Sequence, residues 1–362
     1  MKISRIIILV VVIALVALVG LYAFEVVLAP TTHPSNSTWH PAARYPLELS
    51  GAYGVAGQQC MNGTTYIYCI GGQDIKGGPR SETFSSPSIS PSSGNITTWV
   101  SDSSQYPQNI NGQSCVAYSG SAYCVGGTYD DGGDDVASSY YASLTGGTLG
   151  SWSPTTAFPI PVDSQSCVAS SGYIYCVGGN NETDATNADS ISSNSVWFAP
   201  LSSSGIGSWI HTTAYPQNLY FPTCFATVGY IYCLGGADGN NNAQSTDYYA
   251  TLSSAGVGAW TKTTAYPVAV SGQACVISSG YIYCVGGEET STSYTNTVRY
   301  APVSSGGIGT WKQGANYPLS IGTTCVFSSG DVYCVGGFDG SSVGESSAVY
   351  YASLASLSGA TS

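Results

Sequence analysis

The sequence predicts an all-β protein built from repeated units, and three observations carry that prediction. The twelve cysteines fall into six pairs, and within every pair the two cysteines lie nine residues apart. Successive pairs begin 50 to 57 residues apart, a period typical of repeat folds. Short apolar stretches alternate with turns rich in Gly, Pro and Ser, as in all-β chains.

The chain carries little charge, and most of that charge is negative. Its 362 residues include only 8 Lys or Arg and 20 Asp or Glu, which gives a net charge of -12. Without a basic surface the chain is not expected to bind nucleic acid. Its 28 tyrosines and 43% hydrophobic residues exclude intrinsic disorder. Because few groups change protonation on folding, we expect the protein to keep its stability in acid.

Each repeat contains four predicted strands in a fixed order. A Trp strand, as in Gly207-Ser208-Trp209, is followed six or seven residues later by an aromatic-Pro turn such as Tyr215-Pro216. The next strand opens with the first cysteine, and after a tight turn a second strand reads Tyr-Ile-Tyr-Cys-Val-Gly-Gly. A variable polar loop leads to a third strand, as in residues 140–144 and 248–252, before the next Trp.

The two cysteines of each pair are predicted to form a disulfide across a hairpin. In the third repeat the midpoint between the cysteines falls on Ser171-Gly172, which suits a two-residue turn. Counting outward then places the cysteines opposite each other as a non-hydrogen-bonded pair, where the Cα atoms approach to about 4.5 Å. The first repeat centres on Thr64-Thr65 instead, so its turn should differ. The predicted bridges are Cys60–Cys69, Cys115–Cys124, Cys167–Cys176, Cys224–Cys233, Cys275–Cys284 and Cys325–Cys334.

With this pairing no cysteine is left for nucleophilic catalysis, and the nine-residue spacing does not fit a zinc site. Structural disulfides also indicate an oxidising compartment.

These repeats resemble the kelch family. The resemblance lies in a Gly-Gly pair that ends the second strand, an aromatic residue on the third strand and a Trp before the next repeat. It implies that each repeat is one four-stranded blade of a β-propeller. The cysteine pairs are an addition to the family pattern, and the basic residues common after the Trp strand of intracellular members are missing. The Gly-Gly pairs are Gly71-Gly72, Gly126-Gly127, Gly178-Gly179, Gly235-Gly236, Gly286-Gly287 and Gly336-Gly337.

The two ends of the repeat region complete one blade between them. Trp39 and Tyr45-Pro46 form a Trp strand and its turn without preceding strands, whereas residues 350–354 form a third strand without a Trp strand. The sequence therefore predicts a six-bladed propeller over 38–354, closed by its N-terminal strand. Residues 30–37 then form a short stalk and 355–362 a C-terminal tail.

The N-terminal segment 1–29 is predicted to anchor the protein in a membrane. Lys2 and Arg5 precede 19 uncharged residues, 6–24, a length that fits a transmembrane helix. The basic flank predicts a cytoplasmic N-terminus and an extracytoplasmic propeller. The alternative is a signal peptide cleaved after Ala29, in which case the protein is secreted; Pro30 argues against cleavage. Four candidate glycosylation sequons agree with export, at Asn36, Asn62, Asn95 and Asn181.

The candidate ligand residues lie in the variable loops that follow the Gly-Gly pairs. These loops and the Tyr-Pro loops are expected on one face, and they differ most between repeats. Oxygen-rich side chains of this kind can bind Ca²⁺, but the bidentate Glu of an EF-hand is missing, so solvated turns are the favoured interpretation. The candidates are Asp130, Asp131, Asp134, Asp135, Glu182, Asp184, Asp238, Asn240 and Asn242.

The sequence does not favour catalysis. His40 and His211 occupy equivalent positions just after Trp residues, where a solvent-facing role is expected. A galactose-oxidase-like propeller needs a Tyr–Cys crosslink, and a sialidase needs an arginine triad and an Asp box. Paired cysteines argue against the first, and the absence of the box against the second.

The sequence thus favours a non-enzymatic surface protein that binds a glycan or a protein. Trp residues that recur in every repeat are expected to pack between repeats, whereas exposed tyrosines beside Asn and Asp suit sugars. A structural envelope scaffold is the first alternative, and a secreted carbohydrate-active or oxidase-type enzyme is the second. Apart from the possible Ca²⁺ no cofactor is expected.

Overall fold

The computed structural model describes residues 38–358 except 50–51, 64, 88, 90–93, 130–133, 182–190, 228, 291–292 and 340–343. The predicted anchor and stalk, 1–37, and the end of the tail therefore lie outside the described residues. The described part is all-β with antiparallel sheets, as predicted, and includes one short helix, α2 (Leu354–Leu357). No helix in these ranges is long and apolar enough to cross a membrane.

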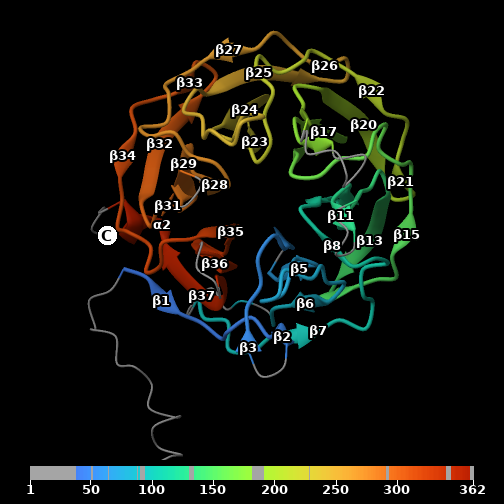
Figure 1. The fold of residues 1–362 in the computed structure, drawn as a ribbon, viewed down its shortest axis with the longest axis vertical. Coiled ribbons are helices and arrows are strands. Elements are labelled where there is room, and N and C mark those ends of the chain that lie inside the picture. The colour runs from blue at the N-terminus through green and yellow to red at the C-terminus, as the bar shows by residue number, and fades with distance from the viewer. Residues whose placement is uncertain are drawn as a thin grey trace, which may run out of the picture. The chain divides into compact units, whose positions relative to one another are not determined.

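Each repeat forms one antiparallel sheet, in which the strands lie side by side in their order within the repeat (Figure 1). The first three sheets are β4 (Gln59–Asn62), β5 (Ile67–Ile70), β6 (Thr83–Ser85), β7 (Val100–Ser101); β9 (Ser114–Tyr118), β10 (Ser121–Val125), β13 (Ser139–Thr145), β15 (Ser153–Pro154); and β16 (Ser166–Ser170), β17 (Tyr173–Val177), β20 (Val196–Ser202), β22 (Ile210–His211). The other three are β23 (Thr223–Thr227), β24 (Tyr230–Leu234), β25 (Tyr248–Ser253), β27 (Thr261–Lys262); β28 (Ala274–Ser278), β29 (Tyr281–Val285), β32 (Val298–Ser304), β34 (Lys312–Gln313); and β35 (Gly322–Ser328), β36 (Asp331–Phe338), β37 (Glu345–Ser353), β1 (His40–Pro41).

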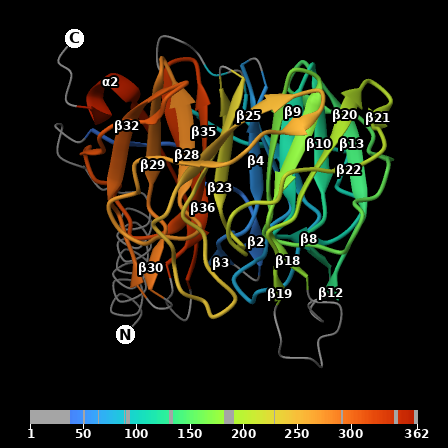
Figure 2. The same ribbon diagram turned by 90° about the horizontal axis from the view of Figure 1, so that it is seen from above.

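Short strands extend the loops at the two ends of the sheets. At one end β14 (Thr148–Leu149), β21 (Gly205–Ile206), β26 (Gly256–Val257) and β33 (Gly307–Ile308) pair with the third strand of their sheets. The loops at the other end contain β2 (Glu48–Leu49), β3 (Ala52–Tyr53), β8 (Ile110–Asn111), β11 (Thr128–Tyr129), β12 (Asp134–Asp135), β18 (Asn180–Asn181), β19 (Ile191–Ser192), β30 (Glu288–Thr290) and β31 (Ser293–Tyr294) (Figure 2). The pairing of β8 with β11 confirms that the Tyr-Pro loops and the variable loops share one face.

The first strands of the sheets form a closed cycle. Each contacts the first strand of the sheet before it and of the sheet after it, in the order β4, β9, β16, β23, β28 and β35. β35 in turn contacts β4, and the sheets follow one another around a central axis (Figure 1). The sixth sheet joins both ends of the chain, because β1 pairs with β37 and places His40 opposite Tyr351. The predicted pairing of the N-terminal strand is confirmed.

All six predicted disulfides form, each joining the first two strands of a sheet. The Cα atoms of each pair lie 4.0–4.1 Å apart. In the third repeat both turn residues, Ser171 and Gly172, have positive φ, which is the conformation of a type I′ turn. The first repeat differs as expected, since pairing ends at Asn62 and Ile67 and the Gly63 amide bonds to the Tyr66 carbonyl.

The Gly-Gly pairs join each sheet to the next through the backbone. The second glycine of every pair donates its N–H to a carbonyl in the loop before the following sheet, at N–O distances of 2.7–3.1 Å. The six bonds are Gly72–Ile110, Gly127–Val162, Gly179–Leu219, Gly236–Val270, Gly287–Ile321 and Gly337–Val55, and the last one closes the cycle. A side chain on the first glycine would collide with this contact: a Cβ on Gly126 would lie 2.3 Å from the Val162 carbonyl oxygen. The motif is therefore an inter-sheet joint.

Aromatic pairs secure the loops that connect the sheets. The ring before each Pro packs edge-on against the Trp of the following sheet, with centroids 4.8–5.2 Å apart. The outer strand begins one residue after the Trp and not at it, because the indole turns back toward this loop. Trp209, for example, packs on Phe158 and donates Nε1–H to the Thr156 carbonyl. These contacts agree with a structural role for the recurring Trp residues.

The fourth sheet contains a fully buried carboxyl group. Asp247 has no exposed surface and stands where the third and fifth sheets carry Val196 and Val298. Burial raises the pKa of Asp247 to about 7, although the N–H groups of Gly235 and Tyr266 favour its charged form. The phenols of Tyr215 and Tyr266 interact electrostatically with Asp247, and Tyr266 also interacts with Arg299 and Glu289.

We expect the free energy of unfolding to decrease as the pH rises from about 4 to about 7. The folded state holds the Asp247 proton more tightly than the unfolded state does, so its stabilisation is complete below the unfolded pKa and is lost as pH rises through the folded pKa. The loss should be on the order of 2–4 kcal/mol, and Asp247→Asn should flatten the profile. Thermal unfolding from pH 3 to pH 8 measures both. A wild-type profile as flat as that of the variant would contradict the prediction.

Replacing Gly126 should weaken the joint between the second and third sheets. Gly126→Ala adds a Cβ against the Val162 carbonyl as well as strain at positive φ, and should cost about 3 kcal/mol. Gly120→Ala is the matched control, because Gly120 also has positive φ but has no atom within 4 Å of its added Cβ. It should cost about 1 kcal/mol. Equal losses in chemical denaturation would show that the joint contributes nothing.

Candidate functional site

The closed cycle of first strands surrounds a cavity of about 530 Å³. Residues from all six sheets line it, including the first cysteine of every disulfide. This volume falls in the range of pockets that hold small molecules. The lining residues Asn111 of β8 and Glu288 of β30 place one end of the cavity at the loop end that carries the variable loops (Figure 2). We call this end the mouth.

A backbone arc builds the rim of the mouth. The residue that starts the turn into each of the first five sheets has positive φ: Gly57, Gly112, Ser164, Phe221 and Gly272. Each of the last four donates its N–H to the carbonyl of the one before, at 2.8–3.4 Å. The arc is interrupted at the sixth sheet, where Gly322 is extended and pairs with Phe338. The rim is therefore asymmetric although the repeats are similar.

Glutamines fix the wall beneath the rim. In four repeats a buried Gln stands two residues before the first cysteine and donates Nε2–H to a carbonyl of the preceding sheet, at 2.6–3.3 Å. These are Gln58, Gln113, Gln165 and Gln273, and Gln58 bonds across the closing joint to Val335. The sequence analysis missed them, although Gln recurring two residues before a cysteine was the signal that could have found them.

Aromatic side chains and carboxylates meet at the mouth. Phe221 lies on the rim with 46% of its surface exposed, and Tyr294 packs edge-on against Phe338 at 5.7 Å between ring centroids. Asp163 and Glu288 are the carboxylates among the lining residues. Burial raises the pKa of Glu288, while a hydrogen bond from Tyr294 favours its charged form. The mouth thus offers flat apolar rings beside strong hydrogen-bond acceptors.

The charge at the mouth is negative. No Lys or Arg occurs among the described residues that line the cavity. Burial raises the pKa of Tyr220, and the nearby charges of Glu288, Asp238 and Asp163 raise it further. Three carboxylates therefore act on one phenol, that of the residue before Phe221. An anionic ligand would meet unfavourable electrostatics there.

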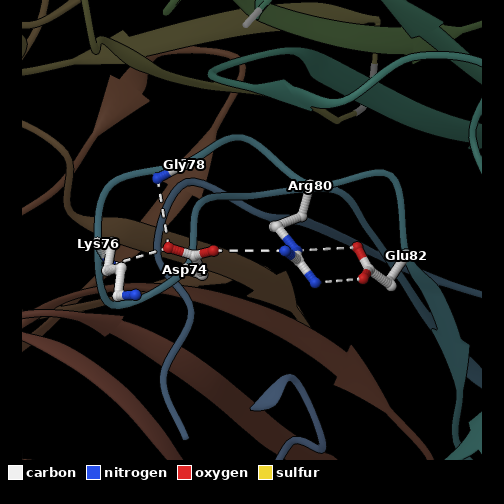
Figure 3. A network of polar contacts seen from close by, with 5 residues as sticks. All are labelled: Asp74, Lys76, Gly78, Arg80 and Glu82. Atoms are coloured by element: carbon white, nitrogen blue, oxygen red, sulfur yellow. Dashed lines mark hydrogen bonds and ion pairs between the residues drawn. The ribbon is translucent and has the colours of Figure 1, made fainter. Parts of the chain in front are cut away.

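Arg80 is engaged by carboxylates of its own loop. Arg80 lies 3.4 Å from Asp74 and bonds to both oxygens of Glu82, at 2.6 and 3.2 Å (Figure 3). Asp74 also accepts the N–H groups of Lys76 and Gly78 through Oδ1 (Figure 3). The network stabilises the loop that starts at Gln73, a lining residue whose amide accepts a bond from Asn111.

The predicted ligand loops are only partly described, and their described residues form no common metal-binding group. Asp238 accepts the N–H groups of Asn240 and Asn242, so its carboxylate is used inside its own turn, and these bonds lower its pKa. Asp134 and Asp135 lie on β12, where Thr128 donates to Asp135. Asp130, Asp131, Glu182 and Asp184 lie outside the described residues. Within the described ranges no three His, Cys, Asp or Glu residues form a metal-binding group.

The asparagines of three of the four sequons are described residues. Asn95 is exposed; Asn62 is also exposed, but its Nδ2 donates to the Phe327 carbonyl. Asn181 is half-buried on β18, and Asn36 lies outside the described residues. His40 and His211 are exposed and pack on Tyr351 and Trp197 respectively. All twelve cysteines are in disulfides, so none can form a crosslink to tyrosine.

No protein-family model matches the chain, and no curated protein sequence matches it.

Proposed function

We propose that the chain is a six-bladed kelch-like propeller that acts as a binding module outside the cell. The six sheets, the cycle of contacts between their first strands and the pairing of β1 with β37 support six blades and their closure. Six disulfides support an oxidising compartment. Residues 1–29 then serve as the membrane anchor, with the propeller on the extracytoplasmic side.

The ligand in this proposal is a cell-surface glycan bound at the mouth. The observation that carries it is the combination of the exposed Phe221 ring with Asp163 and Glu288 on one rim. Sugars present an apolar ring face that stacks on aromatic side chains and hydroxyl groups that donate to carboxylates and amides. Gln73 and Asn111 add amides to the same lining. The mouth thus carries the groups that a pyranose ring requires.

Removing the mouth carboxylates should weaken glycan binding. The full-length protein in mild detergent, kept oxidised, is screened on a glycan array, and affinities for the best ligand are then measured by calorimetry. Asp163→Asn and Glu288→Gln should each weaken binding about tenfold, because each removes a charge-assisted hydrogen bond. Asp134→Asn is the matched control, since Asp134 is exposed at the same end but does not line the cavity. It should leave the affinity unchanged.

Two results would contradict the proposal. Retention of the protein by envelope proteins with no glycan bound would favour the scaffold function. Glycan binding that Asp134→Asn weakens and the two mouth variants do not would place the site in the variable loops.

A further inference from the structure

The backbone conformation of Phe221 does not suit its side chain. Its φ is +51°, a region that L-residues other than Asn, Asp and Gly rarely adopt and that is a clear outlier for a bulky side chain. The equivalent rim positions hold Gly57, Gly112 and Gly272, and Ser164 at the fourth. Phe221 therefore occupies a rim position at which the other four repeats of the arc have glycine or serine.

Packing does not account for this residue either. Nearly half of the Phe221 surface is exposed, and its ring packs at a tilt against that of the neighbouring Tyr220, at 5.3 Å between centroids. Five large hydrophobic side chains are exposed among the described residues: Val100, Tyr129, Ile210, Phe221 and Tyr281. Of these only Phe221 lines the central cavity. A strained backbone at a cavity mouth is typical of functional residues.

Along the rim, the backbone links Phe221 on either side to a segment that carries a carboxylate. Phe221 donates its N–H to Ser164, whose hydroxyl donates to Asp163 at 2.5 Å. On the other side the Phe221 carbonyl accepts from Gly272, and the adjacent Ser271 pairs through its backbone with Glu288. In the order of the arc, the exposed Phe221 therefore stands between Asp163 and Glu288, which both line the cavity.

We infer that Phe221 is the stacking platform for an uncharged sugar ring in the mouth of the cavity. This inference rests on the proposed function and assigns its ligand class. The apolar face of the sugar lies on the phenyl ring, and its hydroxyl groups donate to Asp163 and Glu288. Anionic sugars are disfavoured, because the described lining residues include two carboxylates and no basic side chain.

The test separates loss of the ring from relief of the strained backbone. In the full-length protein, Phe221→Gly should raise the melting temperature, because glycine adopts positive φ without strain, and should weaken binding of the best uncharged glycan about tenfold or more. Phe221→Trp retains a ring and should keep the affinity within about threefold. Tyr281→Ala is the control for removing an exposed aromatic residue that does not line the cavity.

The uncharged glycan is also compared with its uronic acid counterpart, in which a carboxylate takes the place of the hydroxymethyl group. The counterpart should bind about tenfold more weakly, and its deficit should grow at low salt. If Phe221→Gly binds as wild type does while Asp163→Asn does not bind, the inference fails and the proposed function stands. If the wild-type protein binds no glycan, both fail. Preference for the uronic acid would overturn the ligand class.

Discussion

The hydrogen bond from the second glycine of each Gly-Gly pair to the next sheet is the contact on which the molecule depends. Each sheet buries little by itself, and its inner strands are covered only by the neighbouring sheets. The bond requires backbone to approach backbone, so the first glycine cannot carry a Cβ. Six such bonds turn a linear row of sheets into a cycle, and the Gly337 bond to Val55 joins its ends. Closure also leaves fewer exposed sheet edges that could pair with another chain. A chain with so few charged side chains could not protect such edges by charge.

The mouth is a consequence of this closure. The cycle brings six equivalent turns around one axis, where the backbone arc from Gly57 to Gly272 fixes their relative positions. A turn that follows the repeat pattern contributes only backbone groups and small side chains to the rim. Where a turn departs from the pattern, as at Phe221 and Gly322, the rim acquires its aromatic ring and its asymmetry. The repeated residues hold the structure, and the exceptions supply the proposed function.

The sequence predicts the structural features that recur within each repeat. The cysteine spacing with a central Ser-Gly fixes each hairpin, and the lone Trp39 and the last strand predict how the ends meet. It does not predict groups that only closure brings together. Asp163 and Glu288 are 125 residues apart, and the sequence analysis placed the ligand residues in loops such as the Asp238 turn. The positive φ of Phe221 has no local signal, because nothing in Tyr-Phe-Pro indicates a glycine-like position. The burial of Asp247 results from the residues that pack around it, and the local sequence gives no sign of it.

Hydrogen–deuterium exchange at the six joint amides tests the central claim most directly. The amides are those of Gly72, Gly127, Gly179, Gly236, Gly287 and Gly337, and peptides that cover each pair resolve them in the oxidised full-length protein. If the cycle is closed by equivalent bonds, all six exchange slowly, and Gly337 exchanges as slowly as the five joints within the chain. If Gly337 exchanges at the rate of an exposed loop while the other five are protected, the ring is open. The rim that depends on its closure would then not exist.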